Sequence, residues 1–275
     1  MTNESIRKFN LENSTAIVTG GAGMLGRRFC KVLLENGANV AIFDINEKEI
    51  KNTLEDVKKK TGKVNIIGIN CDLTDENSVI NSVNKVNTKF GNLNILVNNA
   101  ATKTEKWDKF FEKFENYDLS VWKEVMSVNI DSMFLTTKIV GKNMVKNKIK
   151  GSIIQISSIY GLIAPNQSIY KGSLYKKIKI NTPAVYSVSK SAVIGLSKYL
   201  STYWGSKGIR VNTLIPGGIE SGQNNEFKKN YSKNVPLNRM GNLDEIENAL
   251  LYLASEASSY VTGQNLVIDG GMSTW

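Results

Sequence analysis

The sequence predicts one α/β domain in which helices cover both faces of a parallel sheet of about seven strands. Short runs rich in β-branched residues alternate along the chain with longer segments of helical periodicity, as successive βαβ units require. Several strand runs are almost continuously apolar, as expected of a sheet buried on both faces. No repeat or flexible linker divides the 275 residues, so residues 1–275 are expected to form a single domain.

The expected elements follow one another in a regular order. Strands are predicted at Thr15–Thr19, Asn39–Asp44, Lys63–Asn70, Asn94–Asn98, Ser152–Ser157, Arg210–Ile215 and Asn265–Ile268. Helices are predicted at Met24–Asn36, Glu47–Thr61, Asp75–Phe90, Leu119–Asn147, Ala184–Gly205 and Leu243–Ser255. Two stretches, 102–120 and 163–183, break this rhythm and are too long to be simple connections, so we expect inserted loops there. Long loops at strand ends are usually functional.

The composition excludes several kinds of catalytic site. The chain has no histidine, so a Ser-His-Asp triad, a Cys-His nucleophile pair and a histidine-ligated zinc ion are all excluded. Cys30 and Cys71 lack partners at metal-ligand or redox spacing, and we interpret them as buried thiols. No metal site is predicted, and any catalyst must use carboxylate, Tyr, Lys, Ser, Asn or a bound cofactor.

Charge and hydropathy predict neither a nucleic-acid nor a membrane partner. The 35 Lys and Arg residues exceed the 25 Asp and Glu residues, which gives a formal charge of +10, but the lysines are scattered along the chain. The N-terminus lacks the apolar segment of a signal peptide, and no run approaches the roughly 18 apolar residues that a membrane helix needs. A cytoplasmic location is therefore expected.

A glycine-rich turn, Gly20–Gly26, joins the first strand to the first helix. This is the context of a dinucleotide-binding turn, in which glycines permit close backbone approach and the helix N-terminus faces the pyrophosphate. Asp44 ends the second strand 18 residues after the turn, where its carboxylate would bind the ribose hydroxyls and repel a 2′-phosphate. NAD(H) is therefore favoured over NADP(H). We expect Arg27 and Arg28, beyond the turn, to face solvent.

A tyrosine and a lysine four residues apart share one helix face, so the ammonium group can favour the phenolate. The chain has three such pairs: Tyr175/Lys179, Tyr186/Lys190 and Tyr203/Lys207. Only Tyr186/Lys190 opens a long predicted helix after the fifth strand, just beyond Pro183. We interpret the other two pairs as solvated surface or helix packing.

With these residues identified, the sequence resembles the short-chain dehydrogenases/reductases, small one-domain branch, over nearly its whole length. The matching motifs are Thr19–Gly26, Cys71-Asp72-Leu73, Asn98-Asn99-Ala100-Ala101, Asn129, Ile156-Ser157-Ser158, Tyr186-x-x-x-Lys190, Pro216-Gly217-Gly218-Ile219 and Val261–Gly271. The resemblance implies a Rossmann-type doubly wound sheet and homodimer or homotetramer contacts through the helix Ala184–Gly205 and the preceding long helix, Leu119–Asn147. A substrate-loop region is expected at about 219–241.

The resemblance also implies roles for individual residues. Tyr186 would donate or accept the proton and Ser158 would hold the substrate oxygen. Lys190 would lower the tyrosine pKa and bind the nicotinamide ribose, and Asn129 would fix a water in the proton relay. The implied cofactor-binding residues are Gly20, Gly23, Met24, Leu25, Gly26, Asp44, Ile45, Asp72, Leu73, Asn98, Ala100, Tyr186, Lys190, Pro216, Gly217 and Ile219.

Each of these residues has a simpler interpretation when taken singly. Ser158 could be a strand-end or turn hydroxyl, Asn129 a helix-interior amide, and Asp72 an N-terminal helix cap. Ser157 could exchange roles with Ser158, but the family's Ser-x-x-Gly pattern, counted to Gly161, selects Ser158. Two departures from the family pattern add alternatives. Met24 stands where the small branch usually has glycine, and the resulting spacing of the glycines resembles that of the extended branch, which contains epimerases and dehydratases. Ser158 and Tyr186 are 28 residues apart, a longer spacing than usual, which the loop at 163–183 explains.

The predicted function is an NAD(H)-dependent oxidoreductase that interconverts a secondary alcohol and a ketone on a polar or anionic sugar-type substrate, which includes phosphorylated and nucleotide-linked sugars. Lysines of the two inserted loops could attract an anion, although solvated surface lysines are the simpler interpretation. The chain most resembles oxidoreductases of flagellin-modification and nonulosonate-sugar gene clusters. The alternatives are an epimerase or dehydratase with tightly held NAD, a 3-oxoacyl-type carbonyl reductase, or a non-catalytic protein that senses NAD or binds nucleic acid.

Overall fold

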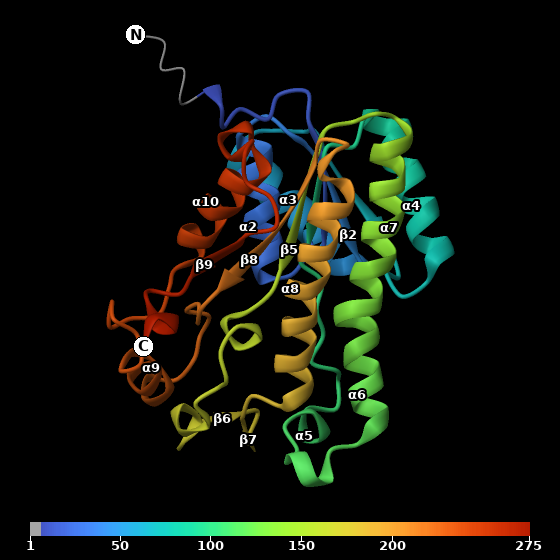
Figure 1. Cartoon of the computed structure of the whole chain (residues 1–275). Coiled ribbons are helices and arrows are strands. Elements are labelled where there is room, and N and C mark those ends of the chain that lie inside the picture. The colour runs from blue at the N-terminus through green and yellow to red at the C-terminus, as the bar shows by residue number, and fades with distance from the viewer. Residues whose placement is uncertain (1–6) are drawn as a thin grey trace.

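The computed structural model describes residues 7–275 and has a seven-stranded sheet at its centre (Figure 1). The strands are β1 (Thr15–Thr19), β2 (Asn39–Asp44), β3 (Ile66–Asn70), β4 (Ile95–Asn98), β5 (Gly151–Ile156), β8 (Ile209–Pro216) and β9 (Asn265–Ile268). They are parallel and lie in the order β3-β2-β1-β4-β5-β8-β9. The order reverses between β1 and β4, which is where ligands bind in folds of this kind. The predicted doubly wound α/β fold is confirmed.

Helices pack on both faces of the sheet (Figure 1). One face carries α2 (Met24–Glu35), α3 (Glu47–Thr61) and α10 (Leu243–Ala254), and the other carries α4 (Glu76–Phe90), α7 (Ser132–Lys146) and α8 (Ala184–Gly205). Within β1, Ala16 and Val18 enter the first core whereas Ile17 enters the second, and all three are fully buried. This alternation follows from the two-residue period of a strand.

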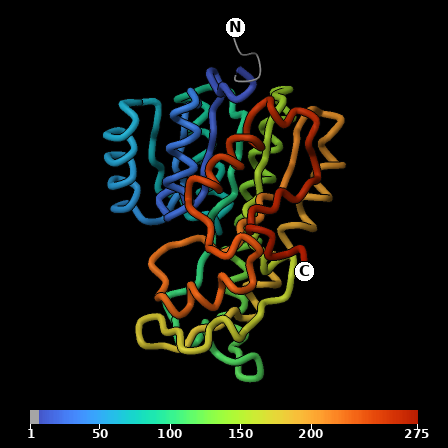
Figure 2. The backbone as a smooth tube through the Cα atoms, turned by 90° about the vertical axis from the view of Figure 1, so that its left-hand side faces the viewer, coloured from blue at the N-terminus to red at the C-terminus, as the bar shows by residue number. Residues whose placement is uncertain are grey.

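Three segments gather beyond the carboxyl ends of the strands, coloured green, yellow and orange in Figure 2. The first contains α5 (Trp107–Phe110) and the turn η1 (Phe114–Asn116). The second contains η3 (Ile159–Gly161), η4 (Gln167–Tyr170) and a hairpin of β6 (Leu174–Tyr175) and β7 (Ile178–Lys179). The third contains α9 (Asn225–Ser232). These elements are too short for sequence periodicity to predict.

The structure corrects two predicted elements. The helix expected at Leu119–Asn147 is α6 (Leu119–Met126), a π-helical turn η2 (Ser127–Asp131) and then α7. The third strand begins at Ile66 rather than Lys63. Cys30 and Cys71 are buried free thiols, as predicted. Along residues 7–275, no helix combines the length and apolar character that crossing a membrane requires.

Candidate active site

The glycine turn between β1 and α2 is packed so tightly that three of its glycines, Gly20, Gly21 and Gly26, admit no side chain. A Cβ on Gly21 would lie 2.9 Å from the Val18 carbonyl oxygen. Gly20 has a φ of 58°, and a Cβ there would lie 2.9 Å from Ala100 Cα after β4. A Cβ on Gly26 would overlap the Gly20 carbonyl oxygen. Gly23 is exposed, and a Cβ there would meet only the Gly20 carbonyl oxygen, at 3.2 Å. The turn is therefore closed toward the sheet and open on the side where a pyrophosphate would approach.

The N-terminus of α2 lacks both a side-chain cap and an acidic residue in its first turn. By contrast, the N-termini of α3, α4 and α10 are capped by Asn46, Asp75 and Asn242. Uncapped N–H groups with the positive end of the helix dipole suit an anion. The residues present therefore fit the pyrophosphate of a dinucleotide, with Met24 and Leu25 in the first turn.

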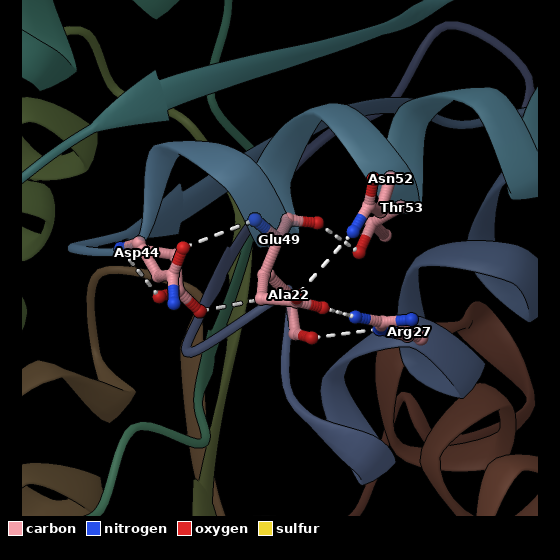
Figure 3. A network of polar contacts seen from close by, with 7 residues as sticks. Ala22, Arg27, Asp44, Glu49, Asn52 and Thr53 are labelled. Carbon is pink, nitrogen blue, oxygen red and sulfur yellow. Dashed lines mark hydrogen bonds and ion pairs between the residues drawn. The ribbon is translucent and has the colours of Figure 1, made fainter.

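Asp44 lies at the carboxyl end of β2 and is tied to the glycine turn (Figure 3). Its Oδ2 accepts a hydrogen bond from Ala22 N and its Oδ1 accepts one from Asn46 N, each at 3.1 Å. Each carboxylate oxygen keeps a lone pair free, so the group is oriented and can still accept hydrogen bonds from ribose hydroxyls.

The expectation that Arg27 and Arg28 face solvent was wrong. Arg27 Nε donates to Ala22 O at 2.7 Å, and its guanidinium pairs with Glu49 of α3 (Figure 3). Arg28 pairs with Glu247 of α10 at 2.9 Å. Both guanidinium groups are half-buried and have carboxylate partners, because α2 packs between α3 and α10.

The remaining residues of the cofactor prediction lie at the same edge of the sheet. Ile45 and Leu73 follow β2 and β3, and Asp72 Oδ1 accepts hydrogen bonds from Thr74 N and Oγ1 at 2.9 and 2.7 Å. Asp72 is not a helix cap, because Asp75 caps α4.

Asn98 is the last residue of β4, and Ala100 lies two residues beyond it. Asn98 Nδ2 donates to Thr137 Oγ1 at 2.7 Å and to Gln155 Oε1 at 2.8 Å, so this buried amide joins β4 to α7 and β5. Ala100 N donates to Thr19 Oγ1 at 3.1 Å, beside the glycine turn.

Ser158 follows β5 and lines the cavity that Tyr186 of α8 also lines. The neighbouring Ser157 is turned away from the cavity, because its Oγ donates to the Lys190 carbonyl oxygen at 2.7 Å. Gly161 packs against the same carbonyl, where a Cβ would lie 2.6 Å from the oxygen. This close contact of η3 with α8 brings Ser158 and Tyr186 together although 28 residues separate them.

Burial governs the titration of Tyr186 and Lys190. It raises the pKa of Tyr186, and a hydrogen bond with the Ser158 side chain opposes that shift. It lowers the pKa of Lys190 to about 8. The Lys190 ammonium group donates to Ile156 O at 3.0 Å. Desolvation is therefore the larger effect on Tyr186 in this structure, and the lowering of its pKa by Lys190 that the family resemblance implies stays a prediction.

Asn129 lies in the π-helical turn and is fully buried. Its Oδ1 accepts a hydrogen bond from Thr102 N at 2.9 Å, and its Nδ2 donates to Ser189 Oγ at 3.2 Å. Ser189 Oγ in turn donates to Tyr186 O at 2.9 Å. The side chain thus joins the segment after β4 to the first turns of α8, and a π-turn is a common device at functional sites.

The two other tyrosine–lysine pairs do not form comparable sites. Tyr175 and Lys179 lie on opposite strands of the β6–β7 hairpin, where Lys179 pairs with Leu174 rather than with Tyr175. Tyr203 is 59% exposed on α8, and Lys207 lies beyond the end of that helix.

The cavity beside Tyr186 has a volume of about 500 Å³ and is lined by all three segments beyond the sheet. Aromatic side chains form much of its lining: Trp107, Phe110, Phe111, Tyr160, Tyr170, Tyr175, Tyr186, Phe227 and Tyr231. Lys103 lines it too. The four lysines of 163–183 do not line it, so solvated surface is the better interpretation for Lys171, Lys176, Lys177 and Lys179.

The loop after β8 closes the far side of the site. Pro216 ends the strand, and Gly217 N donates to Ile268 O of β9 at 2.9 Å. Ile219 is buried and bridges to Gly241. Gly218 N donates to Tyr231 Oη of α9, a contact that the sequence did not suggest because α9 was not predicted.

Comparison with known proteins identifies the family. Residues 21–273 match the family model described as enoyl-(acyl carrier protein) reductase. The chain belongs to the short-chain dehydrogenases/reductases. As a member of this family it is an oxidoreductase that acts on CH–OH or carbonyl groups with a nicotinamide cofactor, so the non-catalytic alternative is set aside.

Similar members of the family carry different names. The 3-oxoacyl-[acyl-carrier-protein] reductase FabG of Chlamydia muridarum is 36% identical over 269 residues, which cover 96% of this chain and 98% of that protein. A short-chain dehydrogenase from Leptospira borgpetersenii with bound NAD⁺ is 29% identical, with a TM-score of 0.84 and coverage of 99% and 96%. A gluconate 5-dehydrogenase from Burkholderia cenocepacia in complex with NADP and tartrate is 27% identical, with a TM-score of 0.83 and 98% coverage of both chains.

Proposed function

We propose that the protein interconverts a secondary alcohol and a ketone with NAD(H), using Tyr186 as the acid/base on a small, polar, hydroxylated substrate. The observation that carries this proposal is that Ser158 and Tyr186 line one cavity with Gly217 and Gly218 of the loop after β8. Asn129 and Lys190 lie directly behind them in the hydrogen-bonded framework.

The residues of this chain would handle the proton. When bound, the nicotinamide cofactor supplies or accepts the hydride. Ser158 and Tyr186 would hold the substrate oxygen between their hydroxyls, and Tyr186 would give its proton to that oxygen during reduction. Because burial raises the pKa of Tyr186, the phenol keeps its proton at neutral pH and is a competent donor. Lys190, one turn along α8, would stabilise the phenolate that remains.

Two observations support NAD(H) as the cofactor. Asp44 is held where its carboxylate would meet the adenosine ribose and repel a 2′-phosphate. Arg27 and Arg28, the cations next to the turn, are engaged by Glu49 and Glu247 and are not free to bind that phosphate. The solved relatives differ in this respect, since one holds NAD⁺ and another NADP.

The lining of the cavity supports a hydroxylated substrate. Among the aromatic rings lie hydroxyl and amide side chains: Ser158, Tyr160, Ser173, Asn181, Thr182, Ser221, Gln223 and Asn224. The gluconate 5-dehydrogenase with tartrate points to the same chemistry. A second candidate, a 3-oxoacyl reductase, is favoured by the identity to FabG and by the aromatic lining. An epimerase or dehydratase, a phosphorylated or nucleotide-linked sugar and the flagellin-modification and nonulosonate resemblance stay predictions.

Replacement of Tyr186 with Phe tests the proposal. Turnover, followed by NADH absorbance with a panel of polyols, ketoses, sugar acids and a 3-oxoacyl thioester, should fall by at least about 10²-fold. NADH affinity, measured by fluorescence titration, should stay close to that of the wild type. Tyr175→Phe and Tyr203→Phe are the matched controls and should keep their activity. Loss of turnover in Tyr175→Phe alone would show that the site has been assigned to the wrong tyrosine.

We also propose that the protein is a homodimer or homotetramer in which α8 takes part. Val188, Tyr199 and Tyr203 on this helix are 43%, 63% and 59% exposed. Apolar and aromatic side chains gathered on one helix face are typical of a protein–protein contact.

A further inference from the structure

The substrate cavity contains one charged side chain. Of the residues that line it within 7–275, only Lys103 carries a charge, and no carboxylate is among them. Lys103 forms no ion pair with any Asp or Glu of residues 7–275, whereas Lys109 in the same segment pairs with Asp118 at 3.8 Å. The cavity therefore has a net positive charge and a cation without a counterion.

The surroundings of Lys103 are those of a ligand-binding group. Its side chain is accessible to a molecule in the cavity, yet protein surrounds the cavity on several sides, and this desolvation lowers the pKa of Lys103. An anion bound beside the ammonium group would compensate for the lost hydration.

The backbone at Lys103 is fixed by its neighbours. Thr102 N donates to the buried Asn129 Oδ1 at 2.9 Å, and Thr104 N donates to Thr102 Oγ1 at 3.0 Å. Because Asn129 is also joined to Ser189 of α8, the position of Lys103 is linked to the helix that carries Tyr186.

Three further atoms of the lining lack hydrogen-bond partners. They are the Tyr160 hydroxyl, the Ser173 hydroxyl and Asn181 Oδ1, each of them buried. Tyr160 is 8% exposed and Ser173 3% exposed. The hydroxyl of the neighbouring Tyr170 is already engaged with Thr182 Oγ1 at 2.6 Å. Each of these atoms has less than 1 Å² of accessible surface, so a ligand in the cavity does not reach it, and the polar groups within reach are exposed ones such as Ser221 and Asn224.

We propose that the substrate is a small polyhydroxylated monocarboxylate, whose carboxylate binds Lys103 in the cavity that Ser158 and Tyr186 line. This inference rests on the proposed function, because it assumes that the reacting carbon lies at Tyr186. A carboxylate carries the single charge that one lysine can balance. A phosphate dianion is usually held by additional cationic or N–H donors, and no second cation lines the cavity within the described residues.

Calorimetric titration of the NADH complex tests the proposal without requiring turnover. The probes are a series of aldonates of four to six carbons, which includes D-gluconate, the matching uncharged alditols, and inorganic phosphate. At least one aldonate should bind about tenfold or more tightly than its alditol, and phosphate should bind more weakly than that aldonate. Failure of every aldonate to bind, equal binding of an alditol, or tighter binding of phosphate would overturn the proposal.

Substitutions then assign the groups. Lys103→Met should weaken aldonate binding about tenfold or more and leave alditol binding unchanged, and Lys103→Arg should restore part of the affinity. Lys177→Met, on the hairpin outside the cavity, is the matched control and should bind as the wild type does. Unchanged aldonate affinity in Lys103→Met would refute the role of this lysine.

A substrate without a carboxylate and a protein without the proposed activity would give different results. If only the carboxylate assignment is wrong, the wild type still turns over uncharged alcohols or ketones with NADH, and Tyr186→Phe does not. If the proposed function is wrong, no member of the panel changes NADH absorbance although ligands still bind.

Discussion

Lys190 Nζ donates a hydrogen bond to the Ile156 carbonyl oxygen at 3.0 Å, and each of these two residues is 4% exposed. The bond satisfies one of the three donors of the ammonium group but does not replace its hydration, so burial lowers the pKa of Lys190 to about 8 from an ordinary value of 10.5. Between these two pH values the unfolded chain binds more protons at this residue than the folded chain does. The contribution of Lys190 to stability therefore rises with pH across this window, and its desolvation penalty is complete below pH 8.

Lys190→Met should remove this pH dependence. The free energy of unfolding of the wild type, relative to the variant, should rise by up to about 1 kcal/mol for each pH unit between pH 8 and pH 10. Urea denaturation at constant protein concentration measures the difference, and Cys30, whose buried thiol acts in the opposite direction, cancels because both proteins contain it. Lys198→Met, on the exposed side of α8, is the control. Parallel stability curves for the wild type and Lys190→Met would contradict the prediction.

Gly26→Ala should destabilise the fold, whereas Gly205→Ala should not. A Cβ on Gly26 would overlap the Gly20 carbonyl oxygen, so this change should destabilise the fold by about 1–3 kcal/mol and weaken NADH binding. A Cβ on Gly205, the last residue of α8, would meet no atom within 4 Å, so this substitution is the control and should leave the fold as stable as the wild type. Thermal melts with and without NADH measure both effects. An unchanged melting temperature in Gly26→Ala would show that the turn can relax.

Asp44→Ser should change the cofactor preference. The variant loses the carboxylate that would bind the ribose hydroxyls and repel a 2′-phosphate, so the ratio of kcat/KM with NADH to that with NADPH should fall about tenfold or more. The ratio is informative even though Ala22 N also loses its acceptor, because that loss affects both cofactors alike. Glu47→Gln, in the exposed first turn of α3, should leave the ratio unchanged. A ratio that stays constant in Asp44→Ser would exclude the carboxylate as the determinant.

The sequence predicted those features that depend on local patterns. The seven-stranded sheet follows from short β-branched runs that alternate with segments of helical periodicity, and the glycine turn and Asp44 follow from spacing along the chain. The π-helical turn was missed because the apolar period of α6 and α7 continues through it, so Asn129 was expected in an ordinary helix.

Contacts between distant segments could not be predicted in this way. The partners of Arg27 and Arg28 come from α3 and α10, and only packing brings them together. Family spacing had favoured Ser158 over Ser157, but the hydrogen bond that turns Ser157 toward Lys190 exists only in the folded chain. The short elements that line the cavity have two to eight residues, too few to show a period.

Lys177→Gly should stabilise the β6–β7 hairpin. Lys176 and Lys177 form its turn with φ values of 47° and 67°, a conformation that glycine and asparagine adopt far more readily than lysine. Glycine at the second position should relieve about 1 kcal/mol of strain. Lys176 is best retained, because its ammonium group lies 5.4 Å from the Trp107 ring centroid. Amide hydrogen exchange in the hairpin should be slower in Lys177→Gly than in the wild type. Lys179→Gly serves as a control, and faster exchange in Lys177→Gly would contradict the prediction.

Tyr199→Glu combined with Tyr203→Glu should dissociate the proposed oligomer. The two rings stack at 5.7 Å with an interplanar angle of 15° and stand exposed on α8, so together they present an apolar surface that a second copy would cover. Two carboxylates in a buried contact would be unpaired and desolvated, which strongly opposes association. Sedimentation velocity should show a dimer or tetramer for the wild type and a monomer for the double variant. Tyr260→Glu replaces a fully exposed tyrosine after α10 and should sediment as the wild type does. A wild type that sediments as a monomer, or a double variant that still associates, would exclude this face of α8 as the contact.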